Sequence, residues 1–208
     1  MGISALFNDP ATFILWLVAI ITALTVHEFS HALAGKLQGD PTAELEGRLN
    51  LNPLSHIDWL GLAMLVFVGF GWAKPTPFNP YNLRFKKWGS AVVALAGPVS
   101  NALMVALVAV ALSVVIRVTG MTPDNLLMQF LLMVIRINII LGLFNLVPIP
   151  PLDGSKLLYS FIQDRYPHVV AQLEAYGTYF LILFIIVGGP LLTAAVNAVF
   201  RWVVLLIF

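Results

Sequence analysis

The sequence predicts an all-α polytopic membrane protein, with about five transmembrane helices and a re-entrant segment with short β-strands between the first two. Of its 208 residues, 60% are hydrophobic and only 10% are charged, whereas a soluble domain carries about 25% charged residues. Mean hydropathy is +0.92, and several apolar runs are long enough to cross a lipid bilayer. The net charge of +1 gives no indication of a nucleic-acid partner.

The first apolar run covers residues 11–35, where His27, Glu28 and His31 are the only ionisable side chains. A helix over this run would be about 37 Å long, enough to span a bilayer with some tilt. Lys36 follows it as an interfacial anchor. We therefore expect a spanning helix with a polar cluster near one end.

Three more apolar runs follow, at residues 89–116, 125–147 and 175–200. The last contains Gly188-Gly189-Pro190, which predicts two short helices joined by a tight turn and brings the expected number of spans to five. These features predict one integral-membrane domain over residues 1–208. Its catalytic core would cover about 11–160, and its C-terminal helices 170–208.

Between the first two spans, residues 41–87 are expected to dip into the membrane and return. The apolar part, 57–73, has about 17 residues, the short limit for a spanning helix, and the preceding GRLNLN alternates like a strand. If the segment returns, nine of the eleven basic residues share one side: Lys36, Arg48, Lys74, Arg84, Lys86, Lys87, Lys156, Arg165 and Arg201. The positive-inside rule makes that side cytoplasmic.

The sequence HEFSH at residues 27–31 carries the strongest chemical signal. Positions i and i+4 of a helix share one face, so His27 and His31 can bind one zinc ion. Glu28 lies beside the first histidine, where it can act as a general base toward water at the metal. The chain has no cysteine, so the ligands must be His, Asp or Glu. Ionisable groups in a span are costly unless they are paired or functional, which disfavours a merely structural role.

A catalytic zinc site normally takes three protein ligands, so a third must lie at the same depth. Asp153 is the candidate, because it follows the third apolar run in NLVPIPPLDGSKLL (145–158), whose prolines prevent a regular helix. Irregular backbone at membrane depth is tolerated where it lines a polar cavity. With a re-entrant 57–73, two spans separate Lys36 from Asp153, so both face the cytoplasm. The charge count and a shared metal site require the same topology.

Three motifs together resemble the site-2 protease family of intramembrane zinc metalloproteases, in its minimal bacterial or archaeal branch. They are HEFSH at 27–31, LAGPVSN at 95–101 and FNLVPIPPLDGSK at 144–156. The resemblance implies that His27, His31 and Asp153 bind zinc and that Glu28 is the general base. It also implies that Asn145 lies near the active site, where it could hold the substrate backbone or an oxyanion.

The same resemblance implies the reaction and its setting. The reaction would be hydrolysis of a peptide bond within, or at the edge of, the transmembrane helix of a single-span membrane-protein substrate. The protein would lie in a prokaryotic cell membrane with its active site toward the cytoplasm.

Four further residues carry weaker expectations. His56 is a fourth zinc ligand, a residue that helps to bind substrate, or a residue that caps or packs the re-entrant turn, and the last is favoured. Gly97 is expected to let the second span pack closely on the His27 helix, with Asn101 hydrogen-bonding across the contact. Arg136, in mid-span, should pair with a carboxylate or line a cavity.

Two alternative functions remain open from the sequence. A metal-ion transporter also places His and carboxylates in spans, but usually on helices related by internal repeats, and no repeat is visible. A non-proteolytic pseudo-protease would bind membrane helices without cutting them, and the intact Glu28 argues against it.

Overall fold

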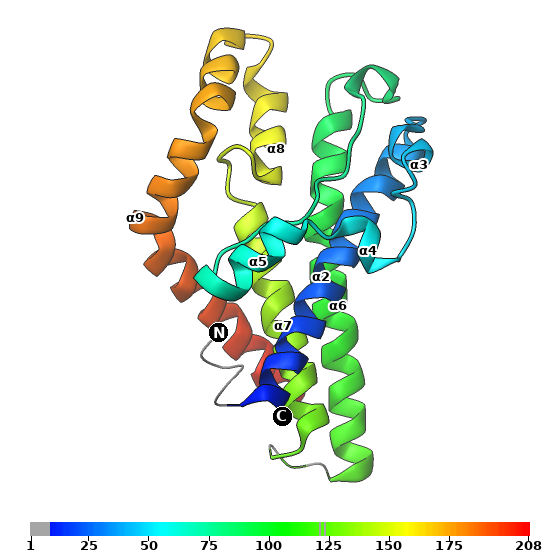
Figure 1. Cartoon of the computed structure of the whole chain (residues 1–208), viewed down its shortest axis with the longest axis vertical. Helices are drawn as coiled ribbons and strands as arrows, with labels where there is room; N and C mark the ends of the chain where they lie inside the picture. The colour runs from blue at the N-terminus through cyan, green and yellow to red at the C-terminus, as the bar shows by residue number, and fades with distance from the viewer. Residues whose placement is uncertain (1–8, 121, 123) are drawn as a thin grey trace.

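The computed structural model describes residues 9–120, 122 and 124–208, and these residues form helices and connecting loops with no strand (Figure 1). Four helices are long and apolar enough to cross a membrane: α2 (Pro10–Leu37), α6 (Gly89–Thr119), α7 (Leu126–Asn145) and α9 (Pro167–Ile207). The shorter ones are α3 (Thr42–Leu45), α4 (Pro53–His56), α5 (Trp59–Val68), the 3₁₀ turn η1 (Pro80–Asn82) and α8 (Asp153–Ile162). The all-helical membrane protein predicted from the sequence is confirmed; residues 1–8 of its predicted domain lie outside the described residues.

The expected count of five spanning helices is wrong, because the last apolar run forms one helix. α9 continues through Gly188, Gly189 and Pro190 without a break. A proline inside a membrane helix removes one backbone hydrogen bond but need not end the helix, and it favours a bend. Figure 1 shows α9 bending partway along its length. As a consequence Arg201 lies near the C-terminal end of α9, which is remote from α8, and not on the same side as Lys156, as the sequence predicts.

The short β-strands expected around GRLNLN are also absent from the described residues, where turns connect α3 and α4. The asparagines of this stretch use their side chains to cap turns. Asn50 Oδ1 accepts from the amide of Asn52 at 2.7 Å, and Asn52 Oδ1 caps α4 by accepting from Leu54 at 3.1 Å. Such side-chain hydrogen bonds compete with the backbone hydrogen bonds between strands. The alternation of Leu and Asn therefore indicates turns in this stretch rather than a strand.

α5 and the chain that follows it form a hairpin whose two ends meet at His56 and Lys74. The amide of Lys74 donates to the carbonyl of His56 at 2.9 Å. The return is so close that a Cβ on Gly61 would lie 2.1 Å from the carbonyl oxygen of Trp72, which requires glycine there. Leu65 of α5 packs against a cluster on α2 formed by Phe13, Trp16 and Ile20. The hairpin therefore reaches along α2 well past the polar cluster and comes back.

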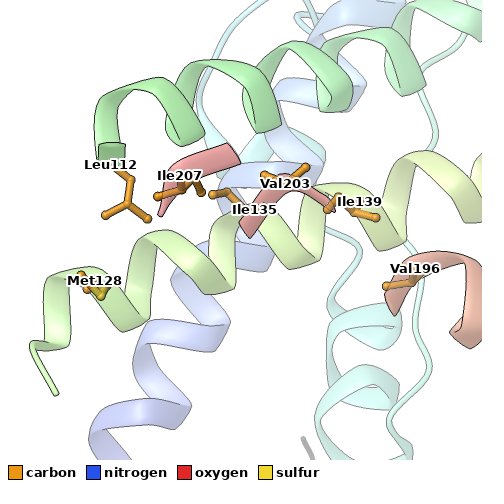
Figure 2. Packing of buried hydrophobic residues seen from close by; sticks show 7 residues of the cluster. All are labelled: Leu112, Met128, Ile135, Ile139, Val196, Val203 and Ile207. Carbon is orange, nitrogen blue, oxygen red and sulfur yellow. The ribbon is translucent and has the colours of Figure 1, made fainter. Parts of the chain in front are cut away.

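The apolar core of the bundle lies between α6, α7 and α9, toward the end where α6 leads into α7 (Figure 2). Its buried members are Leu112, Met128, Ile135, Ile139, Val196, Val203 and Ile207. Because lipid is as apolar as these side chains, helix association here depends on close packing rather than on the hydrophobic effect. The other end of the bundle, where α2 ends and α8 begins, is left for polar groups.

Arg136 of α7 has an amide as its partner rather than the expected carboxylate. Its Nη2 donates to Asn197 Oδ1 of α9 at 2.9 Å, and its guanidinium lies 5.3 Å from the ring centre of Phe200. Both contacts tie α7 to α9. An amide and an aromatic face satisfy the cation without adding a second charge to the span.

Asp40 fastens the end of α2 to the loop that returns from the hairpin. It is 1% exposed, and its Oδ1 accepts from Thr42 and from Asn82 Nδ2, while its Oδ2 accepts from the amide of Asn79 at 2.7 Å. Burial alone would raise the pKa of Asp40, but these hydrogen bonds outweigh it and hold the pKa below its usual value. The carboxylate therefore stabilises the loop in its charged form.

Asp40→Asn is expected to lower the free energy of unfolding by about 1–3 kcal/mol, because an amide NH₂ would face donors and leave a buried group unsatisfied. A carboxyl group whose pKa is lower in the folded than in the unfolded protein stabilises the fold at pH values above its unfolded pKa. That contribution is lost as the pH falls through its folded pKa. The difference in melting temperature between the two proteins should therefore shrink below about pH 4. Thermal unfolding in detergent measures this difference. The control is Asp164→Asn, which removes an exposed surface ion pair and should leave stability unchanged; equal losses of stability in both variants would contradict the prediction.

Candidate metal centre

The two histidines of α2 point into the bundle from one face of that helix. His27 and His31 are 3% and 7% exposed, and their Nε2 atoms lie 3.0 Å apart. The helix begins at Pro10, is capped by the side chain of Asp9, which accepts from the amide of Thr12, and runs unbroken to Leu37. Spacing of four residues on this rigid helix is what places the two rings one turn apart.

Hydrogen bonds to the other ring nitrogen hold each imidazole in place. His31 Nδ1 lies 2.8 Å from the carbonyl oxygen of Val93, which can only accept, so Nδ1 carries the proton. His27 Nδ1 lies 2.7 Å from Asn101 Oδ1, and Asn101 Nδ2 donates to Asn138 Oδ1 at 2.8 Å. In both rings the Nε2 lone pair is therefore left free to bind a metal.

Asp153 closes the site as its third member. It stands in the first turn of α8, just after the proline-rich loop, and its Oδ2 lies 3.2 Å from His27 Nε2 and 3.3 Å from His31 Nε2. This oxygen is buried without a hydrogen-bond partner. In the described part of the chain, these three residues form the group of side chains that could hold a metal ion.

The donor set fits zinc. Three atoms that each present a lone pair to the same point repel one another unless a cation stands between them. Two imidazole nitrogens and one carboxylate oxygen are a catalytic zinc set, and tetrahedral coordination separates such ligand atoms by about 3.3–3.4 Å. The separations of 3.0 to 3.3 Å need only a small expansion to reach that geometry.

Helix α6 packs against the histidines through Gly97. A Cβ at this position would lie 2.5 Å from His31 Nε2 and 2.6 Å from His27 Nε2, distances that real Cβ atoms do not tolerate. Only glycine lets α6 come close enough for Asn101, one turn further along, to reach His27 Nδ1. The predicted packing of this span on the His27 helix is present.

Glu28 is held beside the histidines by a residue that sequence reasoning missed. Glu28 Oε2 accepts from the backbone amide of Thr76 at 2.9 Å and lies 2.8 Å from the Thr76 hydroxyl. Thr76 belongs to the loop that returns from the hairpin, and nothing in one sequence pairs it with a residue 48 positions earlier. The available signal was a single hydroxyl between two prolines, in KPTPFNP.

The two other predicted site residues, Asn145 and His56, are not members of this group. Asn145 is the last residue of α7, and its Nδ2 donates to the carbonyl of Leu141 at 3.0 Å. His56 is 1% exposed and its Nε2 lies 2.8 Å from the carbonyl oxygen of Asn50. That carbonyl makes His56 part of the hairpin's packing, away from the possible metal ligands.

Comparison with known proteins gives the family. A model of peptidase family M50 matches residues 112–188. Three relatives bear the name "Putative zinc metalloprotease". YwhC of Bacillus subtilis is 36% identical over 187 residues, 87% of this chain and 85% of that protein. Rip2 of Mycolicibacterium smegmatis is 28% identical, over 91% of this chain and 70% of that protein.

The third, MJ0611 of Methanocaldococcus jannaschii, is 27% identical over 76% of this chain and 78% of that protein. No solved structure matches the chain significantly. The similarity to YwhC extends over most of both proteins. The chain therefore belongs to peptidase family M50, the site-2 protease family of metalloendopeptidases that its three motifs resemble.

Proposed function

We propose that this protein is an intramembrane zinc metalloprotease that hydrolyses peptide bonds within, or at the edge of, the transmembrane helix of a single-span membrane protein. The observation that carries the proposal is the convergence of His27, His31 and Asp153 at the end of an apolar helix long enough to span a membrane. Glu28 lies on the same helix, next to the first ligand.

The proposed roles follow from the contacts. Zinc held by the two histidines and Asp153 would supply a positive charge that polarises the substrate carbonyl and acidifies water. Glu28 takes a proton from the attacking water and delivers it to the leaving amine. Asn145 has a second amide hydrogen beyond the one bonded to Leu141, and this hydrogen is available to a substrate carbonyl.

Water reaches the site past Asp153. The side chain of Asp153 is 20% exposed, against 4% for His27 and 9% for His31, so the approach is from the loop before α8. A route from that side alone suits hydrolysis in a membrane, because the reacting bond can meet water without a path through the bilayer.

The hairpin offers a place for an unwound substrate. Among the described hydrogen bonds, none uses the amides of residues 70–73, which lie outside any helix, so this edge is free to pair with an extended peptide. Beside it lies a cavity of about 350 Å³ between α2, the hairpin and α7, lined by apolar residues such as Leu24, Phe70 and Phe144. We propose that the edge holds substrate backbone and the cavity receives apolar side chains.

The metal-site end of the bundle is proposed to face the cytoplasm of a prokaryotic cell. Eight of the eleven basic residues lie on the loops and helix ends at this end: Lys36, Arg48, Lys74, Arg84, Lys86, Lys87, Lys156 and Arg165. Arg117 and Arg201 lie toward the opposite end, and Arg136 lies within α7. The bias remains strong without Arg201, and the positive-inside rule assigns the basic end to the cytoplasm.

Neither alternative gains support from the fold. A metal-ion transporter needs a polar path to the other side, but the bundle beyond the site is lined by apolar side chains such as Leu112, Ile135 and Val203. A pseudo-protease needs no positioned base, but Glu28 is held by two hydrogen bonds to Thr76.

Removal of the metal is expected to abolish cleavage reversibly. The purified protein should contain one zinc ion per chain, and a strong chelator should lower cleavage of tagged single-span substrates in liposomes by at least about 100-fold, because polarisation and water activation are both lost. Added zinc should restore it. Elemental analysis and a gel assay measure both quantities. Undiminished cleavage by folded, zinc-free protein would refute the mechanism, and zinc uptake into liposomes without cleavage would favour a transporter.

A further inference from the structure

The general base proposed above is gripped from one side by Thr76. The backbone amide and the hydroxyl of Thr76 both approach Oε2 of Glu28, at 2.9 and 2.8 Å, and the hydroxyl also lies 3.1 Å from the Glu28 carbonyl oxygen. In the described part of the chain no hydrogen bond reaches Oε1. One carboxylate oxygen is thus fixed and the other is left to exchange a proton.

Thr76 is itself held by a buried arginine from the other side of the hairpin. Arg48 is 3% exposed, and its Nη2 donates to the carbonyl of Lys74 and, at 3.3 Å, to that of Pro75. These are the two residues before Thr76. Pro75 donates no hydrogen bond and Thr76 turns its amide toward Glu28, so this part of the loop is held by the guanidinium together with the bond from the Lys74 amide to His56.

We propose that Thr76 and Arg48 form a clamp that positions the carboxylate of Glu28 for proton transfer, with Thr76 acting directly and Arg48 through the carbonyls of Lys74 and Pro75. This proposal rests on the proposed function, in which Glu28 is the base. Both residues are positioning residues, since they act through Glu28 rather than on the substrate.

The clamp answers a specific physical problem. A glutamate side chain has several rotatable bonds, and a misplacement of about 1 Å at a reacting group can cost about 100-fold in rate. Two donors on a single oxygen fix the orientation of the carboxylate plane. One donor would leave it free to rotate.

Arginine is suited to its place in the clamp. Its Nη2 alone reaches both carbonyls, and this nitrogen lies one bond further from the backbone than the ammonium of a lysine would. Burial lowers the pKa of Arg48, and the negative charges of Glu28 and Glu46 act in the opposite direction. Nε and Nη1 of Arg48 are buried without partners, so the residue is kept at a cost that its contacts to the loop must offset.

The test is a steady-state comparison of Thr76→Val and Thr76→Ser in liposomes with a tagged single-span substrate. Valine matches threonine in shape and keeps the backbone amide but removes the hydroxyl. We expect Thr76→Val to lower kcat about 10–100-fold, with KM within twofold and one zinc per chain retained. Thr76→Ser should restore most of kcat. Thr25→Val is the matched control, because the Thr25 hydroxyl is buried near the site but bonds only to the carbonyl of Ile21.

A second variant tests the other half of the clamp. Arg48→Lys keeps the charge but places it one bond short of Nη2, which donates to both carbonyls, so kcat should fall. The double variant with Thr76→Val should be no slower than the slower single variant. If the two losses of kcat multiply in the double variant, Arg48 and Thr76 act independently and the proposed clamp is wrong. Loss of zinc or a raised KM with unchanged kcat in Thr76→Val would show a structural or binding role instead, as would failure of serine to rescue.

The experiments also distinguish failure of the clamp proposal from failure of the proposed protease function. If Glu28→Gln is inactive while Thr76→Val is fully active, the clamp is wrong and the protease mechanism stands. If Glu28→Gln cleaves normally, the assignment of Glu28 as base is wrong and the clamp falls with it.

Discussion

Glu28→Gln is expected to retain zinc and lose cleavage. Glutamine has nearly the same shape and can still accept the hydrogen bonds that Thr76 offers to Oε2, so the ligands on the same helix should stay in place. It cannot accept a proton from water, however, and general-base catalysis contributes about 10²–10⁴-fold to rate. Cleavage of tagged single-span substrates should fall by that factor or more while zinc content stays at one per chain.

The control for this change is Glu44→Gln. Glu44 also lies at the basic end of the bundle, but it is exposed and forms a surface ion pair with Lys36, whose loss should have little effect. If Glu28→Gln keeps more than a tenth of the natural rate, another group must take the proton. If it loses zinc as well, Glu28 would be needed to build the site and its chemical role would remain unsupported.

Gly97→Ala should empty the metal site. The added methyl group would lie about 2.5 Å from both histidine rings, so either α6 must move away or the imidazoles must rotate. Either movement breaks the contact between Asn101 and His27 Nδ1, and changes of this kind cost at least about 10–100-fold in metal affinity. Zinc titration by a competing chelator should show the loss, and cleavage should fall with it.

Gly35→Ala provides the matched control, because it makes the same change on α2 where a Cβ meets nothing within 4 Å. It should bind zinc normally and should be as stable or slightly more stable, since alanine favours a helix by about 1 kcal/mol over glycine. Natural zinc affinity in Gly97→Ala would mean that the helices can separate without moving the ligands. That result would contradict the close packing described here.

Much of the site could be predicted because its residues are brought together either by their spacing on one helix or by the number of membrane crossings between them. His27, Glu28 and His31 lie on one helix, where sequence spacing fixes geometry. Asp153 is far away in sequence, but the absence of cysteine and the count of crossings left it as the remaining candidate at the right depth, and it lies within 3.3 Å of both histidines. Membrane composition and long apolar runs were enough for the helical class.

What could not be predicted depends on contacts between distant segments. Thr76 reaches Glu28 only because the hairpin returns beside α2, and Val93 reaches His31 through a backbone carbonyl that leaves no mark in the sequence. The predicted number of spans was wrong because Gly188-Gly189-Pro190 was interpreted as a turn, although a long membrane helix tolerates a bend at a proline. Asn50 and Asn52 were taken for strand positions, although their side chains cap turns.

The hydrogen-bonded pair Asn101–Asn138 has a consequence for the protein's tolerance of heat and detergent. It joins α6 to α7 and, through His27, both helices to α2. An ion bound to His27 would therefore be connected to all three helices. Binding to the folded state alone adds stability by mass action, about 4 kcal/mol when free zinc is 1,000 times its dissociation constant. Zinc bound by these ligands would therefore stabilise the packed bundle reversibly, and the free zinc concentration would set the size of that contribution.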